Sequence, residues 1–435
     1  RILDAHLAAV RSTMAQLVEK QFAEARNYER SRNGEPERTG NLVYALFAHD
    51  TSRALDPQGH IHAVVANLTR DLKGNWKALW NGEIWKNNTT IGQFYHAAFR
   101  AQLQKLGYET EAAGKHGAFE IRGVPGGVIK AFSTRAAEIE AKIAETGATT
   151  LATKKQITLY TRDPKLVVED RTALVEGWKT RAAELGFDGK PLVAEAMARV
   201  QHQARPSLRE TASQAFAEIA ERISAAMRPP SALAVSGTAA LFLPAETIKA
   251  QHATASAIRH LSEREAAFSP HAILASALGF QIKGLEGEAV VTRIGELVRD
   301  GHLIPGRSER ADGHYDLVTT PEALAREQQI LDRLDAGAGQ GRAFMAPDLA
   351  MARLQEAARE LGLERAGVDS WQLNEGQLAA GVAILSGTDR FLNIQGVAGA
   401  GKSTLLGALD KVLGAEGVKL IGLAFQNKMV ADLRG

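Results

Sequence analysis

Three histidines lie close together in the chain, and their type and spacing suit a metal site. His49, His60 and His62 fall within fourteen positions of a 435-residue sequence that has twelve histidines and no cysteine. Without thiolates, any bound metal must be held by nitrogen and oxygen ligands. Three neutral imidazole nitrogens leave coordination positions open, which favours a catalytic divalent ion over a closed structural site.

Two strands are needed to bring these histidines together. "NLVYALFAHD" and "HIHAVVANLTR" are rich in β-branched and aromatic residues and are separated by the turn-forming "DPQG". Alternate side chains of a strand share a face, so His60 and His62 project together. Antiparallel pairing through residues 50–59 returns His49 to His60. The sequence therefore predicts three converging imidazoles at the end of a hairpin, with a chance cluster on a loop edge as the alternative.

A second motif could bind phosphate. "GVAGAGKST", residues 396–404, fits the pattern G-x-x-x-x-G-K-[ST], between an expected strand "RFLNIQ" and a helix beginning at the lysine. Its glycines allow backbone N–H groups to surround phosphate oxygens at a helix N-terminus. Lys402 is expected to contact the β- and γ-phosphates, and Ser403 to bind Mg²⁺. The predicted nucleotide site comprises Gly396, Gly399, Gly401, Lys402, Ser403 and Thr404.

Composition and the chain ends indicate the class of protein and whether the chain is complete. The composition, 45% hydrophobic and 23% charged, is that of an ordinary globular protein, and no apolar run is long enough to predict membrane insertion. The lack of cysteine fits a cytoplasmic location. The chain begins "RILDAHLAAV" without an initiator Met and ends "VADLRG" within an α/β unit, so we expect an internal fragment of a longer protein.

Three regions are predicted from the element patterns. Residues 1–205 are expected to be α+β, with a first helix reaching about Arg30 and a helix over 89–107 that Gly107 ends. Residues 206–370 are expected to be a mainly helical accessory region. Residues 371–435 are expected to begin an α/β P-loop domain, with a further strand at "VKLIGLAF".

The accessory region contains an order of elements typical of a winged helix. "SPHAILASALGF" begins a helix with Ser269 as N-cap and Pro270 at its first position. "EGEAVVTRIGELVRDGHLI" predicts a second helix, and "GRSERADGHYDLVTT" a following hairpin. Nucleic-acid contact by this unit is one interpretation, and a structural accident of helix order is the other.

The histidine stretch resembles a known family. "GNLVYALFAHDTSRALDPQGHIHAVVANLTR" is similar to the three-histidine motif of conjugative relaxases of the TraI/TrwC (MobF) type, members of the HUH endonucleases, and the similarity continues through "GNWKALW", "LGYETE", "FEIRGVPGGVIKAFSTRAAEI", "TRDPK" and "LVEGW". The resemblance implies that His49, His60 and His62 hold a divalent ion, Mg or Mn, at the scissile phosphate. It also implies that these histidines lie on central strands of an antiparallel sheet with flanking helices, and that Arg53 contacts DNA.

The sequence departs from the family's pattern in two ways. Gly59 and Ile61 stand where leucine and threonine are more common, although neither change removes a metal-binding atom. The family's nucleophilic tyrosines lie in an N-terminal segment that is absent here. Tyr44 and Tyr95 are not in that motif and are predicted to be structural. We therefore expect that this chain does not nick DNA by itself.

The C-terminal region resembles superfamily 1 helicases with RecA-like domains. Gln377 in "LNEGQLAAGVAIL" is similar to their adenine-reading glutamine, with a plain surface position as the alternative. "LIGLAFQNKMVADL" resembles their next motif, which meets single-stranded DNA, but has Phe425 and Gln426 where Pro-Thr is more common. The resemblance implies ATP with Mg as cofactor in the complete helicase domain.

Taken together, the motifs predict a bacterial, cytoplasmic conjugation protein. It would nick single-stranded plasmid DNA at the transfer origin by metal-assisted, tyrosine-dependent chemistry and unwind DNA with ATP. The family implies a relaxosome and a type IV secretion coupling protein as partners. Two alternatives remain: a nucleophile-less relaxase-like protein that binds single-stranded DNA, and a metal-dependent hydrolase fused to an unrelated P-loop ATPase.

Overall fold

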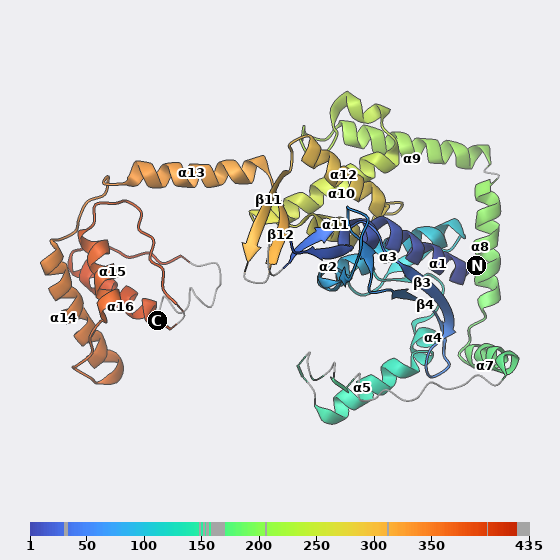
Figure 1. Cartoon of the computed structure of the whole chain (residues 1–435), viewed down its shortest axis with the longest axis horizontal. Coiled ribbons are helices and arrows are strands. Elements are labelled where there is room, and N and C mark those ends of the chain that lie inside the picture. Colours follow the sequence, from blue (N-terminus) through green and yellow to red (C-terminus); the bar gives the residue numbers. More distant parts are fainter. Residues whose placement is uncertain are drawn as a thin grey trace. The chain divides into compact units, whose positions relative to one another are not determined.

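Two units make up the chain in this computed structural model, Arg1–Ala323 and Leu324–Gly435 (Figure 1). The structure describes residues 1–29, 34–147, 149–150, 153, 156–157, 170–204, 207–310, 313–397 and 399–423.

The first unit contains most of the helices. A first helix continues directly into a π-helix, and a long central helix, α3, ends before Gly107, whose φ of 84° lies in the left-handed region that favours glycine. The described helices of this unit are α1 (Ile2–Thr13), the π-helix η1 (Met14–Phe22), α2 (Gly82–Lys86), α3 (Asn88–Lys105), α4 (Gly126–Ala131), α5 (Thr134–Thr146), α7 (Arg171–Glu184), α8 (Gly189–Ala204), α9 (Leu208–Ala226), the 3₁₀-helix η2 (Gly237–Phe242), α10 (Ala245–Ser262), α11 (Pro270–Gly279) and α12 (Gly287–Arg299).

Where the structure describes this unit, five small antiparallel sheets accompany the helices. Their orders are β2-β1-β7, β10-β12-β11, β3-β4, β5-β6 and β8-β9. The strands are β1 (Glu24–Asn27), β2 (Glu35–Arg38), β3 (Tyr44–Thr51), β4 (Pro57–Val65), β5 (Thr69–Arg70), β6 (Trp76–Lys77), β7 (Leu79–Trp80), β8 (Thr110–Ala112), β9 (Phe119–Ile121), β10 (Ala267–Phe268), β11 (Ile304–Arg310) and β12 (Gly313–Thr319).

Two predictions about the first unit are wrong. The expected helix to about Arg30 ends at Phe22, because Ala23 is extended and Glu24–Asn27 form β1, which pairs with strands on both sides. Ladder pairing outweighs the helical propensity of this stretch. The histidine strands are also not central in a larger sheet, since in the described part of the chain β3 and β4 pair only with each other.

The predicted helices and hairpin of the accessory region are confirmed. Ser269 caps α11 by accepting a hydrogen bond from the backbone N–H of Ala272 at 3.1 Å, and α12 and the β11–β12 hairpin follow. The succession α10, β10, α11, α12, β11, β12 with sheet order β10-β12-β11 supports the winged-helix interpretation, which stays a prediction.

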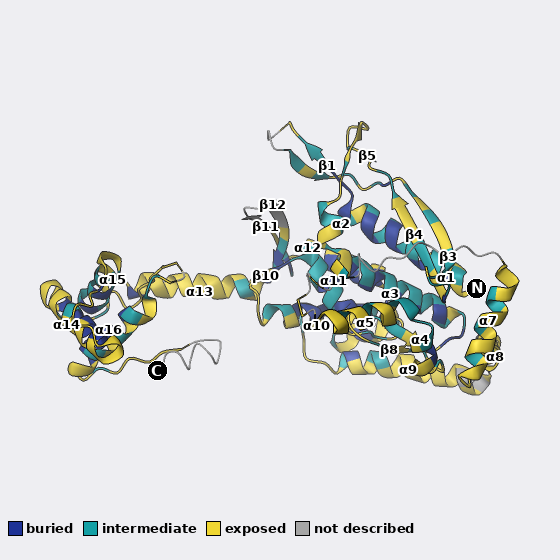
Figure 2. Ribbon diagram, turned by 90° about the horizontal axis from the view of Figure 1, so that it is seen from below, coloured by how far each residue is buried: buried dark blue, intermediate teal, exposed yellow. Residues whose placement is uncertain are grey.

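One hydrophobic core joins this accessory region to the N-terminal part of the chain. It combines Leu17, Phe22 and Phe94 with residues of α10, α11 and α12. Helix α11 packs against α3, and the two lie side by side in Figures 1 and 2. At the start of α12 the contact is so close that a Cβ on Gly287 would lie 2.4 Å from the Phe94 ring. The predicted boundary at 205/206 therefore falls between segments that share a core.

Within the described residues of the second unit, the regular elements are all helices. After α13 (Pro321–Gly337), which begins in the first unit, α14 (Pro347–Ala366), α15 (Glu375–Ser386) and α16 (Lys402–Ala415) bury a core that includes Leu354, Leu385 and Leu409.

The strands predicted at 390–395 and 418–425 are not present in the described residues of the second unit. A strand needs a neighbour with which to exchange backbone hydrogen bonds. Here the backbone N–H of Arg390 donates instead to the Gly337 carbonyl at 3.0 Å, and Phe391 is half exposed. Residues 424 and 425 lie outside the described part.

No helix within the described residues is long and apolar enough to cross a membrane.

Candidate metal centre and phosphate loop

The β3–β4 pairing places the three histidines on one face. His49 lies directly opposite His60, and Phe47 lies opposite His62, so the prediction of strand pairing is confirmed. The ring centroids are 5.3 Å apart for His49 and His60, and 5.0 Å apart for each of the other two pairs. The imidazoles therefore form a compact triangle.

The spacing of the rings fits a shared metal ion. With metal–nitrogen bonds of about 2.1 Å in tetrahedral geometry, the centroids of three ligating imidazoles lie about 5 Å apart. In the described part of the chain no three His, Asp or Glu side chains are arranged as a set of metal ligands, so a shared ion would require the three imidazoles to rotate. Strand register places the three residues on one face, and rotation about the side-chain bonds then sets where the ring nitrogens lie. The Nδ1 of His60 lies 3.0 Å from the Gln58 carbonyl oxygen, which leaves Nε2 for a metal.

The histidine face is open to solvent, whereas the other face of the hairpin packs on α1. Phe47 and Val64 share the histidine face and are 52% and 56% exposed. On the other face a Cβ on Gly59 would meet Leu3 at an ordinary 3.8 Å. Figure 2 shows β3 and β4 largely exposed or intermediate in burial. A large substrate can therefore reach the imidazoles without displacing a covering element among the described residues.

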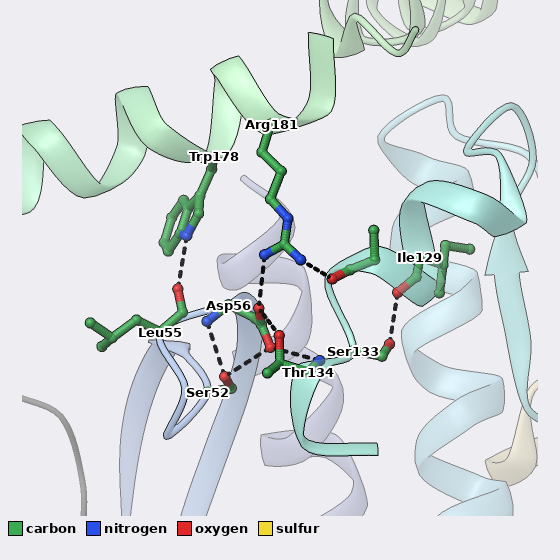
Figure 3. A network of polar contacts seen from close by, with 9 residues as sticks. Ser52, Leu55, Asp56, Ile129, Ser133, Thr134, Trp178 and Arg181 are labelled. Carbon is green, nitrogen blue, oxygen red and sulfur yellow. Dashed lines mark hydrogen bonds and ion pairs between the residues drawn. The ribbon is translucent and has the colours of Figure 1, made fainter. Parts of the chain in front are cut away.

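A buried carboxylate fixes the loop that joins the two histidine strands (Figure 3). The side chain of Asp56 is 5% exposed and accepts hydrogen bonds from the hydroxyl and the backbone N–H of Thr134, at 2.9 and 3.1 Å. Arg181 of α7 lies 3.8 Å from the same carboxylate. The backbone N–H of Asp56 donates to the Ser52 hydroxyl at 3.0 Å. Charge-assisted bonds of this kind are strong when they are buried.

Helix α7 adds two further contacts to this loop. The indole N–H of Trp178 donates to the Leu55 carbonyl at 2.8 Å, as Figure 3 shows, and Arg171 pairs with Asp50. Leu55 has a φ of 60°, a conformation that a residue with a side chain adopts only when its surroundings hold it. We call Asp56, Thr134, Trp178 and Arg181 the loop clamp. Sequence reasoning missed the clamp, because an Asp before Pro gives the same signal whether it is buried or merely turn-forming.

The other residues singled out from the sequence are placed as follows. Arg53 is exposed in the turn between β3 and β4. Tyr44 packs half-buried against a small core around Val18. Tyr95 on α3 lies 3.0 Å from the His6 ring, and burial raises the pKa of its hydroxyl. Burial, and then the charge of His60, lower the pKa of His6 on α1, the helix that packs against β4.

The phosphate loop precedes α16 as predicted. Gly399 and Gly401 have φ values of 81° and 73°, which glycine alone adopts readily. The ammonium of Lys402 donates to the carbonyl oxygens of Gly396 and Val397 at 2.8 and 3.0 Å. These two carbonyls engage the ammonium group of Lys402, so a phosphate could contact it only after they release it. Ser403 and Thr404 follow in the first turn of α16.

Gln377 links the phosphate loop to α15. Its side-chain oxygen accepts from the backbone N–H of Asn374 at 2.9 Å, completing a capping box at the start of α15. Its amide nitrogen donates to the carbonyls of Ala400 and Gly401 at 3.2 and 3.1 Å. The side chain therefore supports the loop, a role that the motif alone did not indicate. Phe425 and Gln426 lie outside the described residues.

Comparisons with known proteins match both ends of the chain. Residues 1–185 match the family model of the TrwC relaxase, and residues 372–435 match that of an AAA domain. Two curated relatives, named Multifunctional conjugation protein TraI, come from Escherichia coli and from Escherichia coli strain K12. Each is 35% identical over 240 residues, 51% of this chain, and the match spans only 13% of the relative's length.

Solved structures also match part of the chain. They include the conjugative relaxase TrwC in complex with OriT DNA in a metal-free and a metal-bound form, each 38% identical with a TM-score of 0.40. The matches cover 43% of this chain and 66% and 65% of those chains.

Proposed function

We propose that the chain carries the metal-holding part of a conjugative relaxase–helicase, because residues 1–185 match the TrwC relaxase model and the chain is similar to TraI. The whole protein would nick single-stranded plasmid DNA at the transfer origin and unwind it with ATP. The observation that carries this proposal is the triangle of imidazoles on the open face of the β3–β4 hairpin.

In this proposal His49, His60 and His62 hold a divalent ion, Mg or Mn. Once bound, the ion supplies Lewis-acid polarisation of a phosphoryl oxygen and offsets charge as the phosphate is attacked. The chain's own contribution is to fix the ligands: the strand register sets the ring spacing, and the loop clamp holds the turn beside His49 and His60. The exposed face beside Phe47 admits the DNA strand, and Arg53 at the adjacent turn would contact its backbone.

The nucleophile in this proposal is a tyrosine outside the present sequence. Tyr44 and Tyr95 are engaged in packing, and Tyr95 is directed to His6. The 435 residues alone should therefore bind metal without cutting DNA. The cytoplasm, the relaxosome and a type IV secretion coupling protein belong to the same proposal.

The phosphate loop supports the helicase part of the proposal. Gly396, Gly399, Gly401, Lys402, Ser403 and Thr404 would bind ATP with Mg, and Gln377 would add an adenine contact when released from its loop-supporting bonds. The AAA match over residues 372–435 favours this assignment. Efficient hydrolysis would require parts of the helicase beyond these residues.

Calorimetric titration of Mn²⁺ into the chain tests the histidine site. We expect His60→Ala/His62→Ala to weaken Mn²⁺ affinity at least 100-fold. His202→Ala/His260→Ala removes two exposed helical histidines and is the matched control, with affinity unchanged. Identical curves for all three proteins would refute the three-histidine site.

A cleavage assay separates the proposal from a metal-dependent hydrolase. Single-stranded plasmid-origin DNA incubated with the chain and Mn²⁺ should stay intact, because no activated nucleophile is supplied. Histidine-dependent cleavage by the 435 residues alone would favour the hydrolase and contradict the tyrosine-dependent proposal.

A further inference from the structure

A cleft of about 350 Å³ lies in the first unit, away from both motifs. Helix α3, the β8–β9 hairpin, α8 and the loop between α11 and α12 form it. Four cationic side chains and two carboxylates are among its lining residues, which include Arg100, Arg122, Arg199, Lys283, Glu109 and Glu111.

Arg100 is the unusual member of this lining. It is only 8% exposed, and within the described residues its guanidinium makes a single hydrogen bond, from Nη1 to the neutral Gln281 side-chain oxygen at 3.3 Å. No described residue forms an ion pair with it, and burial alone lowers the pKa of its guanidinium. Buried charges are normally paired, because removing them from water is costly. The cleft therefore presents a buried cation that lacks an anion.

Most of the other charged side chains around the cleft have partners of opposite charge. Arg122 lies 3.0 Å from Glu109 and 3.7 Å from Glu111, so these three largely neutralise one another. Arg199 pairs with Glu195 at 3.2 Å. Lys283 is exposed and has no bonded partner among the described residues. The uncompensated charge is thus concentrated at Arg100 and Lys283.

The loop between α11 and α12 carries Lys283 and contacts Arg100 of α3, so both cations line the same cleft. Gln281 has a φ of 52°, which is strained for a residue with a side chain. Its side-chain oxygen accepts a hydrogen bond from Arg100. Lys283 follows two residues later and also lines the cleft. Strained backbone of this kind is typical of binding sites.

We infer that this cleft binds a phosphate oxyanion between Arg100 and Lys283. The phosphate comes from a nucleic-acid backbone or from a free phosphate compound, since both present the same oxygens to a guanidinium and an ammonium. Gln281 orients Arg100, and the accessory region thereby completes a site whose other wall belongs to the relaxase region. The inference does not rest on the proposed function, because neither the histidines nor the phosphate loop contribute to it.

Two probes test the site in the chain carrying Lys402→Ala, which removes the phosphate-loop lysine from the measurement. Inorganic pyrophosphate is titrated by calorimetry, and a fluorescein-labelled dT8 oligonucleotide by anisotropy, both without divalent metal. Lys283→Gln should weaken binding about three- to tenfold, and Arg100→Gln at least tenfold. For dT8 the salt slope should fall by about one unit per cation removed.

The exposed Lys190, which does not line the cleft, supplies the control Lys190→Gln with the same change in charge. Loss of both probes in Lys283→Gln supports the shared oxyanion site, loss of dT8 alone identifies nucleic acid as the source, and loss of pyrophosphate alone identifies a free phosphate compound. If Lys283→Gln binds both probes as Lys190→Gln does, the site is refuted. Because Lys283 is exposed, this result stands even if Arg100→Gln fails to fold.

Discussion

The histidine hairpin and the phosphate loop place their functional groups by different means. The hairpin brings together residues eleven and thirteen positions apart through strand register, and a carboxylate from its own loop anchors it to α5 and α7. The phosphate loop is local: its shape comes from glycines with positive φ and from Gln377 beneath it. The hairpin can therefore tolerate changes in side-chain volume, whereas the loop depends on having no side chain at fixed points.

Gly401→Ala should have the largest effect. A Cβ there would lie 2.2 Å from the amide nitrogen of Gln377, in a backbone conformation with φ of 73°. We expect ATP affinity to fall at least 100-fold, measured by titration with a fluorescent ATP analogue, because alanine is strained at this φ and the Gln377 amide must give up its bonds to the loop. Gly414→Ala, on the same unit and with no atom within 4 Å of an added Cβ, is the control. Equal affinities for the two variants would show that the loop is not shaped by this contact.

Glu24→Gln should change how the stability of the first unit depends on pH and leave that of the second unit unchanged. Burial, and then repulsion by Glu83, raise the pKa of the Glu24 carboxyl to about 7 from 4.5. The folded protein thus holds its proton more tightly than the unfolded chain, so stability is lost as pH rises from 4.5 through 7. The loss is up to about 3 kcal/mol.

The glutamine variant removes this penalty. Urea unfolding should find it more stable than the parent chain at pH 8 and equal to it at pH 4.5. The transition of the second unit should not differ between the two proteins. If the difference in unfolding free energy between the parent chain and the variant stayed constant over this pH range, the raised pKa of Glu24 would be contradicted.

Asp56→Asn tests whether the loop clamp positions the hairpin. The amide keeps the volume but removes the charge that faces Thr134 and Arg181, so we expect a loss of about 1–3 kcal/mol in unfolding free energy. Mn²⁺ affinity should fall about three- to tenfold, because the turn beside His49 and His60 loosens. Asp188→Asn, at an exposed turn before α8, is the control. Lower stability with unchanged metal affinity would make the clamp structural only.

Gly59→Ala should have the smallest effect, below about 0.5 kcal/mol. The added Cβ meets only Leu3, at 3.8 Å, and the backbone there is not left-handed. Metal affinity and thermal stability should match those of the parent chain. A large loss of metal affinity or stability in Gly59→Ala would show that the hairpin, like the phosphate loop at Gly401, does not tolerate an added side chain.

The sequence was sufficient for features that depend on neighbours in the chain. The capped start of α11, the end of α3 at Gly107 and the pairing of His49 with His60 all follow from local residue types and turn signals. Two predictions of secondary structure were wrong because strands depend on residues that are distant in the sequence. Glu24–Asn27 form a strand because partners lie on both sides, and residues 390–395 do not because no partner is present among the described residues.

Burial was the main quantity that the sequence did not supply. Asp56 and Arg100 look like ordinary surface charges in the sequence, yet they are 4% and 8% exposed. Their partners, Thr134 and Gln281, lie 78 and 181 positions away. No periodicity or spacing rule relates residues at such separations, so the loop clamp and the cleft emerged only from the folded chain.

The close contact between Gly287 and Phe94 bears on how such a protein can evolve. Multidomain proteins often change by recombination, which exchanges a segment at a linker while each half keeps its own interior. A crossover near residue 205 would here pair an N-terminal half exposing Leu17, Phe22 and Phe94 with a foreign segment that has no matching surface. Recombinants that survive should therefore inherit residues 1–323 as a block, with gene breakpoints concentrated near α13 rather than at the end of the relaxase match.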